Sequence, residues 1–398
     1  MVSLIKFTAM ISFENTEIAF GYKSNKDLKR AQRLFQLVGK PCLVRFGKWI
    51  TPIAFQFRLP IQGIIKSTIF RQFCGGESIN ECDQAIAKLY QHRVGTILDY
   101  SVEGKVEEDD FDATCEEIIA TLNKAKGNSA IPFAVFKVSG ISRHGLLEKL
   151  NDSKNELSQA ERAEFAGVLA RVDKICAKAL EVETPVFIDA EETWIQNTID
   201  QLALSMMKKY NKEWAVVYNT AQMYRHDRLN YLKHLLEDAK RENFLLGIKL
   251  VRGAYMEKER ERAAQKNYKD PIQPNKEATD RDFDVALRFM IENISFFAVC
   301  AGTHNENSST LLTELMNDNG LDKSDKRIYF AQLLGMSDHI SFNLAHADYQ
   351  VAKYVPYGPV KEVMPYLLRR ADENTSVAGQ TSRELNLLTR EMERRANS

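Results

Sequence analysis

Residues 185–222, PVFIDAEETWIQNTIDQLALSMMKKYNKEWAVVYNTAQ, contain the pattern that decides the fold. Two short apolar runs, at 185–191 and 214–222, flank a longer segment whose apolar residues have helical spacing. Both runs are almost continuously apolar, which is typical of parallel strands that are buried on both faces. The stretch therefore predicts a strand–helix–strand unit with parallel strands.

The same alternation recurs along the chain from residue 93 onward. We predict six more strands, at 94–101, 133–140, 247–255, 296–305, 327–335 and 350–358. Helical patterns lie between most of them, and one begins with a capping box of Ser158 and Glu161. Eight such units predict an α/β fold, a TIM-type (βα)8 barrel over residues 93–374. A doubly wound open sheet is the alternative, although no Gly-x-Gly-x-x-Gly turn follows any strand.

The two flanks of the predicted barrel have a different character. Residues 1–92 lack strand alternation, and helical spacing at 28–38 and 79–93 predicts an N-terminal helical region. The stretch 49–73 is rich in aromatic and bulky aliphatic residues. It is either a helical cover over the core, which we favour, or a surface that meets a partner or a membrane. The polar residues 375–398 predict a C-terminal tail or helix.

Composition excludes several classes of protein. The 54 basic and 54 acidic residues cancel, which argues against electrostatic capture of nucleic acid, so we expect no nucleic-acid partner. No apolar run is long enough for a membrane-spanning helix. Glu14 and Glu17 count against an N-terminal transit peptide. The six cysteines form no CxxC pair, so we expect reduced core thiols and no metal site.

Polar residues follow most of the predicted strands at the point where each strand ends. They are Lys137, Asp189, Asn219, Gln222, Arg252, Tyr255, Thr303, His304, Asn305 and Tyr354. Catalytic residues of such barrels lie at the C-terminal ends of the strands. Because a buried polar group is costly unless it is paired, we expect this end of the barrel to hold the functional site.

Several of these residues have a structural alternative beside the functional one. Lys137 is an anion ligand, a Schiff-base lysine or a structural partner of Asp189. Asp189 is a general base or an orienting carboxylate held by Lys137 or an arginine. Arg252 contacts an anion or an electron-rich ring, or else forms a salt bridge with Glu257 at the rim. No second metal ligand lies at a suitable spacing from His304, so a metal site is not indicated. His304 is therefore either a hydrogen-bonding group for a ligand or a core histidine whose hydrogen bonds are satisfied.

The tandem arginines of YLLRRADEN are the most informative pair. Arg369 and Arg370 can reach one anion if this helix end faces the barrel mouth, and Glu373 can hold one of them in position. A solvated helix face is the alternative. Two guanidinium groups and a lysine suit a carboxylate or phosphate. Tyr354 and Tyr366 would add apolar walls with polar tips.

Six of these segments, in order over residues 93–374, resemble the proline dehydrogenases, which are FAD-dependent (βα)8 barrel enzymes. The segments are FKVSG, FIDAEE, NTAQMY, KLVRGAYMEKER, AGTHN and YVPYGPVKEVMPYLLRRADEN. The resemblance implies oxidation of L-proline to pyrroline-5-carboxylate by hydride transfer to flavin N5, with electrons passed to a quinone. This is the first step of proline catabolism to glutamate. The chain looks like the stand-alone enzymes, because it leaves no room for an aldehyde dehydrogenase domain.

The resemblance also implies roles for individual residues. Asp189 and Arg252 are the implied catalytic residues. The proline would be bound by Lys137, Tyr354, Tyr366, Arg369 and Arg370, with Glu373 orienting the cationic groups. FAD would contact Ala190, Gln222, Arg252, Tyr255, Met256, Glu257, Thr303, His304 and Asn305. Tyr354 favours proline, since some relatives that prefer hydroxyproline lack a tyrosine at this place.

A quinone acceptor implies peripheral membrane contact, and the product implies pyrroline-5-carboxylate dehydrogenase as a pathway partner. We expect a cytoplasmic protein that is peripheral on the inner face of the membrane, or a mitochondrial one in a eukaryote.

Three rival functions stay open from the residues alone. They are a lysine-dependent aldolase with Lys137 or Lys249 as Schiff base, another flavin barrel such as a folate reductase, and an amino-acid-binding protein without turnover.

Overall fold

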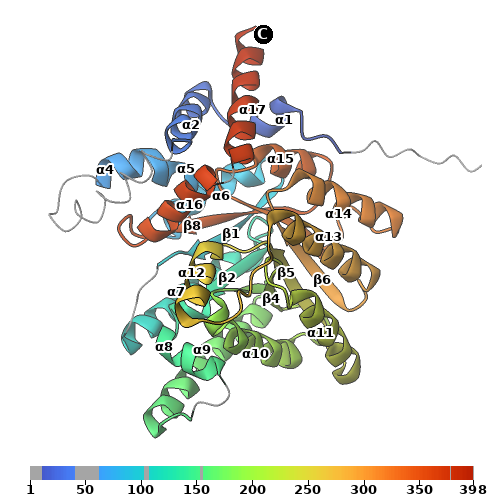
Figure 1. Ribbon diagram of the computed structural model, residues 1–398. Coiled ribbons are helices and arrows are strands. Elements are labelled where there is room, and N and C mark those ends of the chain that lie inside the picture. Colours follow the sequence, from blue (N-terminus) through green and yellow to red (C-terminus); the bar gives the residue numbers. More distant parts are fainter. Residues whose placement is uncertain (1–10, 41–61, 103–106, 153–155, 377, 398) are drawn as a thin grey trace, which may run out of the picture.

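The molecule is built on a closed barrel of eight parallel strands (Figure 1). The structure, a computed structural model, describes residues 11–40, 62–102, 107–152, 156–376 and 378–397. The strands are β1 (Val94–Tyr100), β2 (Phe133–Lys137), β3 (Val186–Asp189), β4 (Val217–Gln222), β5 (Leu246–Val251), β6 (Phe297–Gly302), β7 (Ile328–Leu333) and β8 (Val351–Tyr357). Because β1 pairs with β8, the predicted barrel is confirmed and the open-sheet alternative is wrong.

The predicted strands extend further than the observed ones. The range 133–140 shortens to Phe133–Lys137, and 185–191 shortens to Val186–Asp189. Lys137 and Asp189 form the last pair of the β2–β3 ladder, and the chain leaves the ladder after them. The predicted ranges therefore included residues that follow β2 and β3 at the C-terminal end of the barrel.

Aromatic rings fill the opposite, N-terminal end of the barrel. Phe133 stacks on Phe187 with ring centroids 4.3 Å apart, and Tyr218 and Tyr329 meet Phe133 edge to face at 5.5 and 4.7 Å. Gly247 makes room for this plug, since a Cβ there would lie 2.6 Å from the ring of Tyr218. The interior is thus a packed core at the N-terminal end of the barrel.

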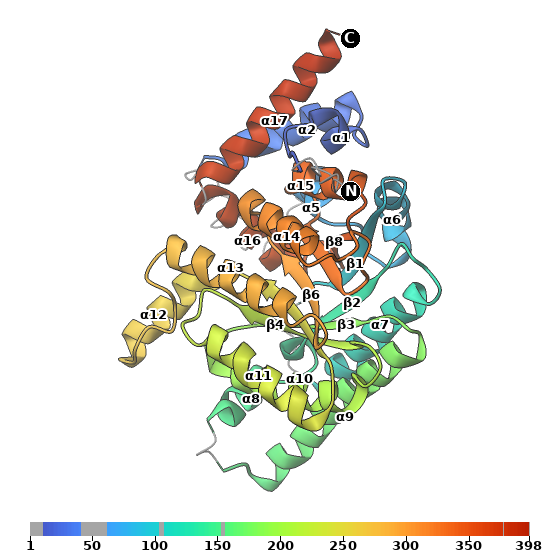
Figure 2. The ribbon, with the colours of Figure 1, turned by 90° about the vertical axis from the view of Figure 1, so that its right-hand side faces the viewer.

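Helices surround the barrel in the order expected for βα units (Figures 1 and 2). They are α7 (Glu108–Ala125), α8 (His144–Asn151), α9 (Gln159–Glu181), α10 (Thr193–Tyr210), α11 (Arg228–Glu242), α12 (Met256–Lys266), α13 (Lys276–Glu292), α14 (Glu306–Asp318) and α15 (Asp338–His346). The predicted capping box is confirmed at the start of α9, where Ser158 Oγ accepts from the Glu161 amide and the Glu161 carboxylate accepts from the Ser158 amide.

The two ends of the chain pack together beside the barrel, where α17 runs past α1 and α2 (Figure 2). The first end contains α1 (Thr16–Phe20), α2 (Asn25–Val38), α4 (Gln62–Ile65), a π-helix (Lys66–Phe70), α5 (Arg71–Phe73), a 3-10 turn (Asn80–Cys82) and α6 (Asp83–Tyr90). The last end contains α16 (Met364–Ser376) and α17 (Ala378–Ala396). Their shared apolar cluster includes Phe35, Phe73, Met336, Leu367 and Leu387. Among the described residues, no helix has both the length and the apolar sequence that a membrane crossing requires.

This packing bears on the expectation for the stretch 49–73. Phe70 and Phe73 are buried in the cluster between the chain ends, as a cover over the core requires. Ile64 is exposed to solvent. Residues 49–61 lie outside the described residues. The division of the chain at residues 92 and 374 stays a prediction.

Candidate active site

Polar side chains face inward where the strands end at the barrel mouth. Strand alternation turns three charged side chains toward the barrel axis, those of Asp99, Lys137 and Asp189. Each of them follows, two positions later on the same strand, a buried residue that points into the barrel interior. Lys137 and Asp189 are also direct neighbours across β2 and β3. The structure therefore brings together the lysine and the aspartate that the sequence singled out.

Lys249 is the closest cationic partner that the structure gives Asp189. Its Nζ donates to Asp189 Oδ1 and also to the hydroxyl of Tyr354. Tyr354 in turn donates to Asp189 Oδ1 over 3.3 Å. The sequence suggested Lys137 or an arginine as the partner of Asp189 and considered Lys249 only as a Schiff-base candidate. Inward alternation along β5 is the signal that could have identified it.

Asp99, at the end of β1, was not predicted as a site residue. It is buried, and it accepts a 2.7 Å hydrogen bond from the hydroxyl of Ser101. Burial raises the pKa of its carboxyl, while the charge of Lys137 acts in the opposite direction. An acidic group whose pKa is raised beside two lysines is typical of a functional pocket.

Arg252 is held rigidly just beyond β5. Its Nε donates to Asp280 at 2.6 Å, and its Nη1 and Nη2 donate to Thr303 at 2.6 Å and Ser308 at 2.9 Å. The guanidinium also lies 4.3 Å from the ring centroid of Phe283. The carboxylate partner of Arg252 is therefore Asp280 on α13. The sequence had suggested a salt bridge between Arg252 and Glu257 as the structural alternative. A guanidinium fixed at every nitrogen is preorganised to act on a ligand without further rearrangement.

Buried polar atoms without a partner lie at the ends of β4 and in the turn after it. Gln222 is almost fully buried, and its Oε1 accepts no hydrogen bond. The hydroxyl of Tyr224 is likewise buried and unpaired. Tyr224 packs against Gly253, whose φ of 125° and lack of a Cβ allow this close approach. Unsatisfied groups of this kind are rare in native proteins, and a bound ligand can satisfy them.

The residues after β6 form a second wall of the mouth. His304 Nδ1 lies 2.9 Å from the hydroxyl of Ser337, and burial lowers the pKa of His304 to about 3. The imidazole is therefore neutral at physiological pH. The side chain of Asn305 caps α14 by accepting from the amides of Asn307 and Ser308. Its carboxamide oxygen thus already serves the helix.

The tandem arginines of α16 lie near the same mouth. Charges on Lys137 and Arg369 both act on the hydroxyl of Tyr255, whose pKa is raised by burial. Arg370 is buried, and its guanidinium lies 5.1 Å from the ring centroid of Tyr366. Charges from β2 and from α16 therefore both act on Tyr255, and the anion site itself stays a prediction.

Two adjacent carboxyl groups after β3 have opposite pKa shifts. Burial raises the pKa of Glu191 to about 7, although Ser139 donates to its carboxylate. Burial also acts on Glu192, but the interactions with His144 and Lys258 outweigh it and hold the pKa at about 2. The sequence gave no sign of this difference, because it depends on partners from three other segments.

The remaining predicted site residues are placed as follows. Ala190 is half-buried directly after β3. Met256 and Glu257 lie exposed in the first turn of α12, at the rim of the site. The side chain of Glu373 lies outside the described residues.

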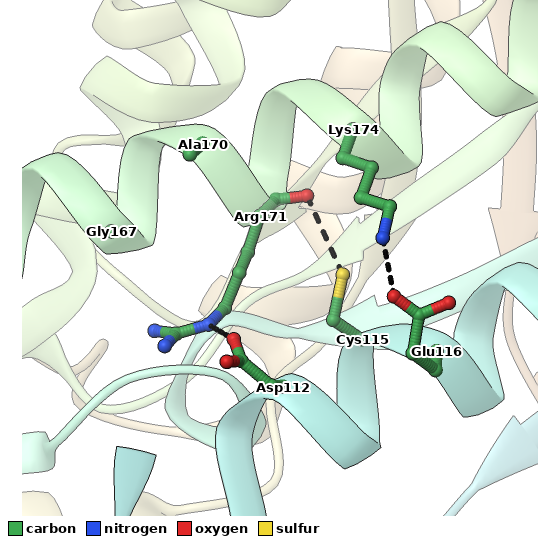
Figure 3. Close-up of a pocket in the computed structure, with 7 residues that line it drawn as sticks. All are labelled: Asp112, Cys115, Glu116, Gly167, Ala170, Arg171 and Lys174. Carbon is green, nitrogen blue, oxygen red and sulfur yellow. Dashed lines mark hydrogen bonds and ion pairs between the residues drawn. The ribbon is translucent and has the colours of Figure 1, made fainter. Parts of the chain in front are cut away.

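One groove of the structure lies away from the mouth. It encloses about 430 Å³ between α7 and α9 on the outside of the barrel (Figure 3). Its cations are paired, Arg171 with Asp112 and Lys174 with Glu116. Burial raises the pKa of the Cys115 thiol to about 11, so the thiol is protonated at neutral pH. With its charges cancelled and its thiol inactive, this groove has no group suited to catalysis.

Comparison with known proteins identifies the fold and the family. Residues 82–383 match the family described as Proline dehydrogenase. The chain is 34% identical over 379 residues to Proline dehydrogenase 1, mitochondrial, of Dictyostelium discoideum, covering 84% of this chain and 66% of that protein. It is 29% identical over 412 residues to Hydroxyproline dehydrogenase of Xenopus laevis, covering 94% of this chain and 88% of that protein.

The fold has a match among solved structures. The crystal structure of proline utilization A from Bdellovibrio bacteriovorus superimposes with a TM-score of 0.72 at 18% identity, covering 93% of this chain and 40% of that one. At this identity the likeness shows the fold alone. The chain spans 66%, 41% and 37% of the lengths of three curated relatives that it matches.

Proposed function

The chain belongs to the proline dehydrogenase family, and from this premise we propose that it oxidises L-proline to pyrroline-5-carboxylate with FAD as cofactor. One observation carries the proposal beyond the family. The barrel is plugged by aromatic rings at one end and lined at the other by Lys137, Asp189, Lys249 and Tyr354, with the arginines of α16 close by. In this proposal, the polar end of the barrel receives a small, ring-shaped carboxylate.

The substrate carboxylate is bound, in this proposal, by Lys137, Arg369 and Arg370. The proposal is supported by the charges of Lys137 and Arg369, which both act electrostatically on Tyr255. Arg370 is supported against the ring of Tyr366. Arginine donates to carboxylates in a fixed fork, which orients the substrate as well as binding it. Tyr354 then supplies the apolar wall for the proline ring.

The residues present fit a flavin. The unpaired Oε1 of Gln222 is an acceptor for an N–H of the isoalloxazine ring, and the fixed guanidinium of Arg252 is a donor for its electron-rich edge. The neutral His304 adds a hydrogen-bonding group without adding charge. We assign further FAD contacts to Ala190, Tyr255, Met256, Glu257, Thr303 and Asn305.

FAD, when bound, supplies the acceptor for a hydride from the proline carbon beside the nitrogen. The task of the protein is positioning, because the reacting carbon must be held about 3–3.5 Å from that acceptor. The cationic groups fix the carboxylate and Tyr354 fixes the ring face. Asp189 already accepts from Lys249 and Tyr354, so we assign it an orienting role in preference to that of a general base. The amine proton leaves to solvent.

Several finer features belong to the same proposal. We propose a quinone as the electron acceptor, reached through peripheral membrane contact, and pyrroline-5-carboxylate dehydrogenase as the pathway partner. We propose a mitochondrial location if the organism is a eukaryote, in line with the printed names of several relatives. In a bacterium we propose a cytoplasmic protein on the inner face of the membrane.

The visible absorption spectrum tests this function. We expect flavin bands in the purified protein, or after reconstitution with FAD, and bleaching of these bands when L-proline is added without oxygen. Bands that stay unchanged would keep the cofactor and contradict the substrate. A colourless protein that does not take up FAD, and that borohydride cross-links to a carbonyl substrate, would favour the Schiff-base aldolase.

A further inference from the structure

Lys249 is a buried ammonium group at the centre of the site. It lies on β5 between Thr220 of β4 and Cys300 of β6, and only 4% of the residue is exposed. A buried charge is costly unless it is paired and hydrogen-bonded. Lys249 therefore has to be explained by what it contacts.

Its contacts hold two site residues at once. The ammonium donates to the carboxylate of Asp189 on β3 and to the hydroxyl of Tyr354 on β8. It also lies over the ring faces of Tyr354 and Phe187, 4.6 and 5.1 Å from their centroids. The rings of Tyr354 and Phe187 are nearly parallel, with an interplanar angle of 13°. Tyr354 is thus fixed at its hydroxyl and along its ring.

From this geometry we infer that Lys249 is a positioning residue that makes Tyr354 a rigid wall and so sets the discrimination between L-proline and ring-hydroxylated proline. The inference rests on the proposed function. A substituent on the substrate ring can enter only if Tyr354 moves. Movement of Tyr354 breaks its hydrogen bond to a buried ammonium, and leaving such a group under-paired carries a desolvation cost.

The same contacts argue against a nucleophilic role for Lys249. A Schiff-base lysine must present a neutral amine to a carbonyl. The Nζ of Lys249 already contacts Asp189, the hydroxyl of Tyr354 and the rings of Tyr354 and Phe187, so structural contacts occupy it. Lys249 therefore acts through its neighbours and not as a reacting group.

The test compares kcat/KM for L-proline and for trans-4-hydroxy-L-proline in the FAD-loaded enzyme. In Lys249→Met and in Tyr354→Phe, we expect the preference for L-proline to fall about tenfold. The double variant should fall no further than either single variant, because both changes remove the same hydrogen bond. Lys23→Met is the matched control, since Lys23 forms an ion pair with Asp338 outside the barrel. That control should lower the melting temperature and keep the preference.

The outcomes separate the two proposals. Wild-type enzyme that does not oxidise L-proline would contradict the proposed function itself. Active wild-type enzyme together with an unchanged preference in Lys249→Met would overturn the positioning role alone, whatever happens to the melting temperature. If Lys249→Met does not fold, Tyr354→Phe decides, because an unchanged preference in that variant overturns the inference equally.

Discussion

Two buried clusters of lysine, aspartate and tyrosine lie on opposite sides of the barrel wall. The inner cluster joins Lys249, Asp189 and Tyr354 at the mouth. In the outer cluster Asp338 of α15 accepts from Tyr22 at 2.7 Å and pairs with two lysines. These are Lys353 of β8 at 2.9 Å and Lys23 at 2.8 Å. Lys353 and Tyr354 are consecutive on β8, so strand alternation turns one outward and the other inward.

The two clusters share their chemistry but differ in their access to solvent. The side chain of Asp338 is 2% exposed, whereas that of Asp189 is 16% exposed and borders the mouth. Burial acts to raise the pKa of Asp338, but Lys23 and Lys353 outweigh it and hold the pKa well below its usual range. The outer cluster therefore ties the N-terminal helices to the barrel, whereas in the proposed function the inner one serves a ligand. Residue types alone do not distinguish a structural from a functional cluster.

The largest expected effect is the loss of the outer carboxylate. Asp338→Ala leaves two buried lysines without their partner, and we expect it to lower the free energy of unfolding by about 3–5 kcal/mol. Urea unfolding measures the change. Glu116→Ala is the control, because Glu116 pairs with Lys174 on the exposed groove of α7 and α9, and there we expect no resolvable change. Equal effects in the two variants would contradict the structural role of the outer cluster.

A matched pair of hydroxyl deletions gives a smaller effect and sharpens the contrast. Tyr22→Phe removes a 2.7 Å hydrogen bond to a buried carboxylate, and we expect it to lower the unfolding free energy by about 2 kcal/mol. Its preference between proline and hydroxyproline should stay that of the wild type. Tyr354→Phe should show the reverse pattern, a smaller loss of stability and an altered preference. Parallel unfolding and kinetic measurements distinguish the patterns, and identical profiles would refute the division between the clusters.

The smallest expected effect concerns His304, whose Nδ1 lies 2.9 Å from the hydroxyl of Ser337. Burial lowers its pKa from 6.5 to about 3, so between these values the unfolded chain binds a proton that the folded chain does not. The neutral, buried His304 therefore stabilises the folded state fully above pH 6.5, and this stabilisation is lost as the pH falls toward 3. When the pH is lowered from about 7.5 to about 5.5, the free energy of unfolding of the wild type should fall by about 1 kcal/mol more than that of His304→Gln.

Unfolding curves at both pH values measure this difference. His144 provides an internal check on the sign, because its interaction with Glu192 raises the pKa of His144 and so favours folding at low pH. His144→Gln should therefore shift the pH dependence in the direction opposite to His304→Gln. The same slope in wild type and His304→Gln would contradict a buried, neutral His304.

The eight strands could be predicted because local pattern and tertiary environment agree. Strands such as β3 and β6 are buried on both faces, so their sequences are continuously apolar until a polar residue ends them or follows them. That ending also located the mouth. Ser158 and Glu161 define the start of α9 within four residues, and a capping box needs no distant partner. Features of this kind follow from short-range chemistry.

The partners of the site residues could not be predicted. Arg252 pairs with Asp280, and Asp189 pairs with Lys249, although neither pair has a spacing that marks it. Continuous apolar runs also hid the inward alternation of Asp99. Pairing across strands and helices depends on barrel closure, which fixes the residues that share one radial direction.

The sequence by itself thus determined the fold class, the order of the elements, the end of the barrel that carries polar groups and the family. Only the tertiary structure decided that Lys249 faces the site, that Lys353 faces away from it, and that Tyr22 and Lys23 reach Asp338 across more than 300 positions. The physical reason is range. Hydrophobic periodicity and capping act between near neighbours, whereas the pairing of buried charges is set by which side chains closure brings within a few ångströms of each other.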